Sequence, residues 1–259
     1  MSRDFELLQR VEQERARPRK SGDAAKTALR TAVENGASKG IEQQPIVAKQ
    51  VTAGLAPAIR NELVKLVQRV FLSTLATKIV MFTGVEAGDC AKWLTACTAE
   101  ILADARCGSV CLLDADLAAP SLHQHFGIAN QKGLCDALWE GRSIQEVTQQ
   151  VGENLWVVPS GSQQKAAQIT PSTFQAATVD LLSLCDYVLI SAPECDHYAT
   201  IGSIGVAVQG AILVLDATRT RRVAAQSAKA ALDAANIRVL GSVFHNRSFP
   251  IPEFLYSRL

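Results

Sequence analysis

The sequence lacks the features of a membrane-spanning or secreted chain. Its longest apolar runs, such as 211–215, fall far short of the roughly 20 residues that span a bilayer. Residues 1–8 carry Arg3, Asp4 and Glu6 where a secretory signal would be apolar. We therefore expect a cytoplasmic protein.

A charge excess and a cysteine pattern are lacking as well. The net charge is only +1, which excludes a global attraction to nucleic acid, so we expect no nucleic-acid partner. The seven cysteines contain no C-x-x-C pair and no metal-ligand spacing. They are expected to be reduced, mostly buried thiols.

Two regions differ in composition. Residues 3–16 place Phe5, Leu8 and Val11 on one face among charged residues, which predicts a short amphipathic helix that needs a partner surface. The polar stretch that follows has few large apolar residues and is expected to be a flexible tether. The predicted organisation is an N-terminal helix and tether at 1–50 and one α/β domain at 51–259.

Within 51–259, apolar strand-like runs alternate with helix-length segments. This order predicts an α/β fold with a mostly parallel sheet and helices on both faces. Ligands of such sheets bind beyond the carboxyl ends of the strands. The expected strands are 78–83, 109–114, 155–159, 187–191, 211–215 and 239–244, and the clearest helices are 61–72 and 93–103.

The segment after the first strand has the form of a phosphate-binding loop. Between the strand and the next helix lie Gly84 and Gly88, the setting in which backbone N–H groups and a helix N-terminus cradle phosphates. A working loop ends Gly-Lys-Ser/Thr, with the Lys on the phosphates and the hydroxyl on Mg²⁺. Here the corresponding triplet is Cys90-Ala91-Lys92, so the charge chemistry is missing.

Two carboxylates, Asp114 and Asp116, follow the second strand. Buried carboxylates at a strand end need a cation or hydrogen-bond donors. Taken alone, the pair could equally cap the next turn. His123 and His125 nearby lack further metal ligands, so helix-surface histidines are the better interpretation.

A longer pattern surrounds these aspartates. Apolar-Asp114-x-Asp116 is followed by Pro120-Ser-Leu-His123, then by Gly133-Leu-x-Asp136-x-Leu. This pattern resembles the second Walker-type motif of the bacterial tyrosine kinases that accompany capsule and exopolysaccharide export. They form part of the deviant-Walker P-loop class, which also contains the chromosome-partitioning ATPases.

The resemblance extends over most of the chain. Residues 155–161 resemble the family's strand ending in Pro-Ala-Gly, and 185–193 resemble its Walker B segment. Residues 239–247 and 249–256 resemble the C-terminal strand and tail of the branch found in exosortase-type systems. The helix carrying Glu62, Lys65 and Arg69 resembles the one that helps to build the family's oligomer.

The resemblance implies a P-loop NTPase-like fold with a pocket for ATP or ADP and Mg²⁺, in which Asp114 would hold the metal if it is retained. The pocket residues would be Gly84, Gly88, Asp89, Cys90, Ala91, Lys92, Asp114, Asp116, Ser191, Pro193, His245 and Asn246. Cys90 could have a lowered pKa beside a helix N-terminus, although an inert thiol is the better interpretation.

The departures from the family fall on catalysis. Ala91 takes the place of the lysine, Lys92 that of the hydroxyl residue, and Ser191 that of the Walker B aspartate. Ala118 and Ala119 replace paired arginines, and the C-terminal tyrosine cluster is absent. Losing one preorganised donor commonly costs about 10²–10³ in rate. A lysine shifted by one residue is rotated by about 100° on a helix, so Lys92 is a poor substitute.

These observations favour a catalytically degenerate member of the family. Such a pseudokinase would control exopolysaccharide, capsule or adhesin assembly by binding an inner-membrane polysaccharide co-polymerase of the chain-length-determinant type. It would act as a peripheral protein, and homo-oligomerisation is a further expectation. The alternative is an active tyrosine autokinase or ATPase using Lys92 and Asp114 in a rearranged loop. A nucleotide-sensing module stays open between them, and a partitioning ATPase is disfavoured by the polysaccharide-kinase features.

Overall fold

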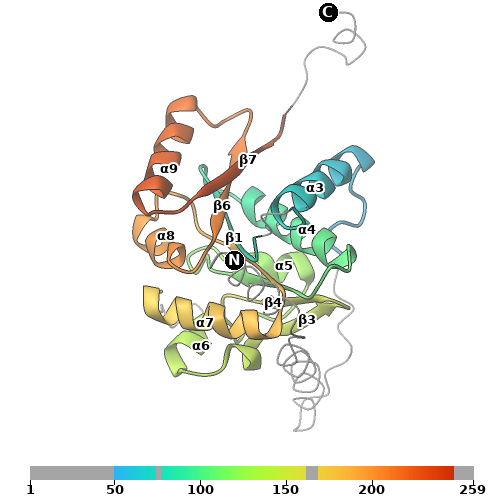
Figure 1. Ribbon diagram of the computed structural model, residues 1–259, viewed down its shortest axis with the longest axis vertical. Coiled ribbons are helices and arrows are strands. Elements are labelled where there is room, and N and C mark those ends of the chain that lie inside the picture. Colours follow the sequence, from blue (N-terminus) through green and yellow to red (C-terminus); the bar gives the residue numbers. More distant parts are fainter. Residues whose placement is uncertain (1–49, 74–76, 162–168, 248–259) are drawn as a thin grey trace, which may run out of the picture.

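A seven-stranded sheet forms the centre of the protein, for which the computed structural model describes residues 50–73, 77–161 and 169–247. The strand order is β3-β4-β2-β5-β1-β6-β7, and every neighbouring pair is parallel except β3 and β4 (Figure 1). The strands are β1 Ile79–Gly84, β2 Val110–Asp114, β3 Gln149–Gly152, β4 Leu155–Val158, β5 Tyr187–Ser191, β6 Gly210–Asp216 and β7 Val239–His245.

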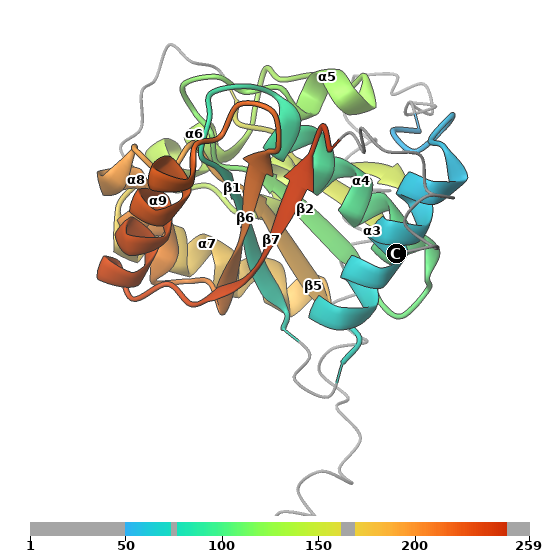
Figure 2. The ribbon, with the colours of Figure 1, turned by 90° about the horizontal axis from the view of Figure 1, so that it is seen from above.

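Helices cover both faces of this sheet, as Figure 2 shows along the sheet edge. On one face lie α3 Pro57–Val70, α4 Cys90–Asp104 and α5 Leu122–Phe126. On the other lie α6 Leu134–Glu140, the 3₁₀ turn η1 Ile144–Val147, α7 Pro171–Leu184, α8 Tyr198–Gly205 and α9 Arg222–Ala234. The predicted mostly parallel α/β sheet with two helical layers is confirmed.

Two apolar cores explain why the strands read as continuous apolar runs. Side chains alternate across a strand, so Val80 and Phe82 of β1 pack toward α3 and α4 while Ile79 and Met81 pack toward α7 and α8. All of β1 is buried. Helix α4 is buried along most of its length, which fixes the loop before it against the sheet.

One strand was not anticipated from the sequence. β3 is short and polar, with alternating half-buried and exposed residues, and pairs antiparallel with β4 through a turn at Glu153 and Asn154. Such an edge strand buries little apolar surface, so it carries no hydrophobic signal. The pattern for a buried strand therefore could not find it.

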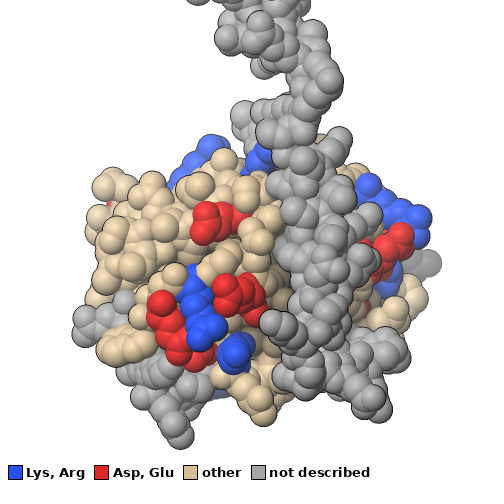
Figure 3. Space-filling view, turned by 90° about the horizontal axis from the view of Figure 1, so that it is seen from below, with Lys and Arg blue, Asp and Glu red and all other residues tan. Residues whose placement is uncertain are grey.

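Several expectations fall outside the described residues: the amphipathic helix at 3–16, the tether, and the apolar tail at 249–256. The division into 1–50 and 51–259 stays a prediction. Among the described residues, no helix is both long and apolar enough to cross a membrane. Figure 3 shows acidic and basic side chains intermixed on one face of the molecule rather than separated into a basic patch.

Candidate functional site

The carboxyl ends of β1, β2, β5, β6 and β7 meet at one edge of the sheet, and the residues of the predicted pocket follow these ends. Gly84 ends β1, Asp114 ends β2 and Ser191 ends β5. His245 ends β7, beside Asp216 at the end of β6. The parallel topology thus gathers segments that are distant in the sequence, as the strand pattern predicts.

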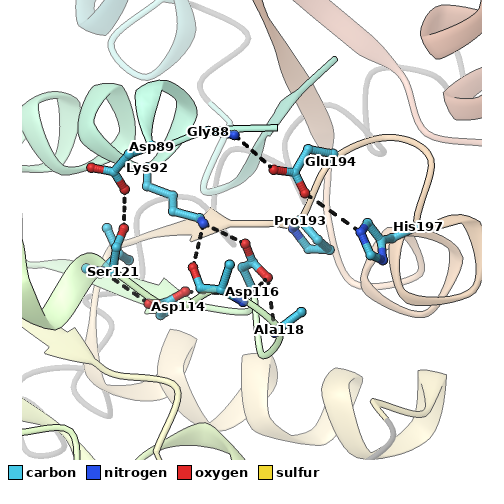
Figure 4. A network of polar contacts seen from close by, with 12 residues as sticks. Gly88, Asp89, Lys92, Asp114, Asp116, Ala118, Ser121, Pro193, Glu194 and His197 are labelled. Carbon is cyan, nitrogen blue, oxygen red and sulfur yellow. Dashed lines mark hydrogen bonds and ion pairs between the residues drawn. The ribbon is translucent and has the colours of Figure 1, made fainter. Parts of the chain in front are cut away.

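The loop between β1 and α4 spans residues 85–89. Gly88 has φ +150, in the region that favours glycine, and its N–H donates a hydrogen bond to Glu194 Oε1 at 3.3 Å (Figure 4). Helix α4 begins at Cys90, directly after this loop. The Glu194 carboxylate therefore accepts a hydrogen bond from a loop N–H group. In working loops, N–H groups of this kind bind phosphate.

Lys92 points inward from the first turn of α4. Its Nζ lies 2.7 Å from Asp116 Oδ2 and donates to the carbonyl oxygen of Ala119 at 2.5 Å (Figure 4). The side chains of Lys92 and Asp116 are 6% and 1% exposed. Lys92 is therefore held in a buried ion pair, and Ala91 beside it offers no charge to a phosphate.

Each carboxylate oxygen of Asp114 and Asp116 has a partner within the chain. Asp114 accepts hydrogen bonds from the N–H groups of Asp116 and Leu122, at 3.3 and 3.2 Å. Asp116 Oδ1 accepts from the N–H groups of Ala118 and Ala119, at 3.2 and 3.1 Å. The turn-capping role weighed in the sequence analysis is thus realised.

Burial raises the pKa of Asp114 to about 7. The nearby charge of Asp116 raises it further, whereas the hydrogen bond from the Leu122 N–H lowers it. The charge of Lys92 has a smaller lowering effect. Asp114 therefore gains or loses its proton near neutral pH, which is unusual for a carboxyl group.

Ser191 stands where Mg²⁺ chemistry would need a carboxylate. It lies between Asp114 on β2 and Phe82 on β1 and is completely buried, and its Oγ has no hydrogen-bond partner among the described residues. Two residues further on, the carbonyl of Pro193 accepts a hydrogen bond from Thr83 Oγ1 at 2.7 Å. Pro193 therefore shapes the end of β5 and offers no charge.

The chain is similar in sequence to a known kinase. The tyrosine-protein kinase YwqD of Bacillus subtilis is 26% identical over 173 residues, which cover 66% of this chain and 73% of that kinase. The chain is related to the bacterial tyrosine kinases. No protein-family profile matches the chain.

Solved structures agree on the fold. The chimerical protein CapA2B2 aligns with a TM-score of 0.70 at 19% identity, over 84% of this chain and all of that one. The kinase domain of the Escherichia coli tyrosine kinase ETK aligns at 0.64 with 18% identity, over 85% and 91% of the two chains. A plasmid partition protein from Borrelia burgdorferi aligns less well, at 0.54 with 16% identity, over 70% and 85%. The fold is thus that of the P-loop NTPases.

In the outer part of the site, the loop between β1 and α4 contacts α5 and the residue before it. Asp89 Oδ2 lies 2.8 Å from His125 Nε2, and Ser121 Oγ donates to Asp89 Oδ1. His125 is thus engaged by Asp89, and His123 has a pKa lowered by burial.

The far side of the loop meets β6 and β7. The ring centroids of Trp93 and His245 are 6.1 Å apart, and Asn246 Nδ2 donates to Asp216 Oδ2 at 3.1 Å. The hydroxyl and N–H of Thr218 hold the pKa of Asp216 down to about 2. Burial raises the pKa of Cys90 to about 11, with further effects from Asp216 and Asp89, so Cys90 is a neutral thiol at neutral pH.

Sequence reasoning missed Glu194, Asp196 and His197. His197 Nε2 lies 3.8 Å from Glu194 Oε2 and 3.9 Å from Asp196 Oδ1, and these three form the one cluster among the described residues whose atoms could surround a cation. Asp196 and His197 are exposed, so the group carries no assignment here. Their position directly after Pro193 was the available signal, but nothing in the sequence shows that Glu194 turns to Gly88.

Other predicted residues lie away from the pocket or serve the scaffold. Glu62, Lys65 and Arg69 are exposed on α3, and Lys65 pairs with Glu62 at 2.7 Å. Gly133 and Asp136 lie at the start of α6, which packs closely on the segment after β4. There the Leu134 N–H donates a hydrogen bond to the Pro159 carbonyl oxygen at 2.8 Å. A Cβ on Gly133 would lie 2.1 Å from that oxygen, which explains the glycine.

Mg²⁺ and ATP, which the relationship to kinases implies, do not fit these residues. The oxygens of Asp114 and Asp116 are satisfied within the chain, and the lysine and Walker B carboxylate are replaced by Ala91 and Ser191. Around the loop, Asp89, Glu194 and Asp216 add negative charge. The arrangement can hold the loops together, but its Lys92 ammonium is paired with Asp116 and is not open to a transferring phosphoryl group.

Proposed function

We propose that this chain is a non-catalytic relative of the bacterial tyrosine kinases that controls exopolysaccharide, capsule or adhesin assembly through binding. Its partner would be an inner-membrane polysaccharide co-polymerase of the chain-length-determinant type, so the chain would act in the cytoplasm, peripheral to the membrane. Homo-oligomerisation through α3 belongs to the same proposal.

The observation that carries the proposal is the buried contact between Lys92 and Asp116. In the loop's register Lys92 replaces the Mg²⁺-binding hydroxyl, and its ammonium is paired 2.7 Å from the carboxylate. Neither Ala91 nor Ser191 can restore the missing charge. Since phosphoryl transfer depends almost wholly on positioning and electrostatic stabilisation, this site favours binding over catalysis.

The exposed face of α3 is the candidate contact surface. Glu62, Lys65 and Arg69 project from it with both signs of charge, while the opposite face buries Leu63 and Val67 in the core. Substitutions on the exposed face therefore leave the core intact and test binding alone.

A capture experiment tests the proposal. The full chain is mixed with detergent-solubilised co-polymerase encoded beside its gene, and we expect the two to elute together. The variant E62A/K65A/R69A should bind less, whereas K229A/D233A, which removes an exposed ion pair from α9, should bind like the wild type. Failure of the wild-type chain to bind any such co-polymerase contradicts the proposed partner.

A further inference from the structure

The metal position of the loop contains a side chain. A phosphate-binding loop places a Ser or Thr hydroxyl on Mg²⁺ from the residue now occupied by Lys92. The Lys92 ammonium contacts two oxygens, Asp116 Oδ2 at 2.7 Å and the Ala119 carbonyl at 2.5 Å. Hard divalent cations select this kind of oxygen ligand.

We propose that the Lys92 ammonium replaces the divalent cation, so that this site is held closed by the chain's own charge and excludes Mg²⁺. Asp116 connects the segment after β2 with α4. Its Oδ1 accepts hydrogen bonds from the N–H groups of Ala118 and Ala119, and its Oδ2 faces the Lys92 ammonium. The segment after β2 is thereby tied to α4 without a metal. A second cation at the same oxygens would meet the repulsion of a buried ammonium.

The loop N–H group that would bind a phosphate oxygen is likewise bound by a side chain of the protein. The Gly88 N–H donates to Glu194 Oε1 at 3.3 Å, and the Glu194 side chain is only 16% exposed. A carboxylate from the segment after β5 thus lies where a phosphate oxygen would accept this hydrogen bond. The chain thus supplies both charges that a metal–phosphate ligand would bring. Lys92 on α4 supplies the positive charge, and Glu194 after β5 supplies the negative charge.

Manganese binding measured by electron paramagnetic resonance tests the inference, because Mn²⁺ prefers the same oxygen ligands as Mg²⁺. The wild-type full chain should show no site-specific binding up to about millimolar Mn²⁺. The variant K92T restores the hydroxyl and leaves Asp114 and Asp116 in place, so it should bind Mn²⁺ at least about tenfold more tightly. The control K65T removes the same charge from exposed α3 and should behave like the wild type.

Because K92T leaves the buried carboxylate of Asp116 without its cation, its thermal unfolding is followed with and without metal. A rise in its midpoint with Mn²⁺ or Mg²⁺, absent in K65T, supports the inference. Binding of Mn²⁺ by the wild type as tight as by K92T overturns it, as does a K92T variant that gains neither binding nor stability. The inference deepens the proposed function, yet metal binding by the wild type would leave the co-polymerase capture experiment unaffected.

Discussion

The ammonium of Lys92 lies 2.7 Å from the carboxylate of Asp116, and both side chains are nearly inaccessible to solvent. A buried pair of this kind adds little net stability compared with apolar packing, but removing one partner leaves an uncompensated charge. The pair therefore makes the loop and the segment after β2 depend on each other.

The first prediction concerns this dependence. Lys92→Ala should lower the free energy of unfolding by about 3–5 kcal/mol, because Asp116 would be left buried without its cation. Lys65→Ala, which breaks an exposed contact of the same 2.7 Å length, should change stability far less. Urea denaturation of both variants provides the comparison, and equal effects would show that the Lys92 pair is not buried.

The second prediction concerns pH. The pKa of Asp114 is raised from 3.8 to about 7 in the folded chain. Between these values the folded state keeps a proton that the unfolded state releases, so this group's contribution to stability falls as pH rises, by up to about 1.4 kcal/mol per pH unit. Above pH 7 the contribution levels off.

Comparison of wild type with Asp114→Asn isolates this effect. The difference in unfolding free energy between the two should change between about pH 4.5 and about pH 8, where the folded-state carboxyl has lost its proton, and stay constant above that. The pH dependence of this difference is the informative quantity. Its absolute value also includes the loss of one acceptor for the backbone N–H groups in the Asn variant. A difference that does not vary with pH would contradict a raised pKa at Asp114.

The third prediction concerns thiol reactivity. Of the seven cysteines, Cys107 is exposed, five are buried and Cys90 is half-buried. Since the thiolate is the reactive form, the raised pKa of Cys90 makes it slow at neutral pH. Native protein should therefore react quickly with a maleimide at Cys107 alone. Cys107→Ser should abolish this rapid labelling. Rapid labelling of Cys90 in that variant, located by peptide mass spectrometry, would mean that the loop activates its thiol.

The fourth prediction concerns the close contact between the start of α6 and the segment after β4. Gly133→Ala should destabilise the fold by about 1–3 kcal/mol or more, because its Cβ would lie 2.1 Å from a backbone oxygen. Gly202→Ala meets open space within α8 and should stabilise by about 0.5–1 kcal/mol. Thermal denaturation of both variants distinguishes crowding at Gly133 from a general effect of alanine.

The sequence predicts the fold well, because the fold follows from local patterns. Buried parallel strands have continuous apolar runs, and their carboxyl ends must share one edge of the sheet. The six strands anticipated from these runs are observed within two residues of the predicted ends. The polar β3 was missed because its pairing with β4 depends on a tertiary contact.

Within the site, residue types were predictable and contacts were not. The absence of charge at Ala91 and Ser191 is visible in the sequence. The direction of the Lys92 side chain depends on how α4 sits on the segment after β2, and Glu194 reaches Gly88 across 106 positions of chain. Such pairings are set by the sheet topology, which brings the ends of β1, β2 and β5 together.

The proposed non-catalytic role requires that this relative of bacterial tyrosine kinases transfers no phosphoryl group. The purified full chain is incubated with radiolabelled ATP and Mg²⁺, and both phosphotyrosine on the protein and released phosphate are measured, with an active bacterial tyrosine kinase as the positive control. We predict neither product above the level without protein. Phosphotyrosine that forms on the wild-type chain and is lost in Asp114→Ala would contradict the proposed non-catalytic role and show an active kinase.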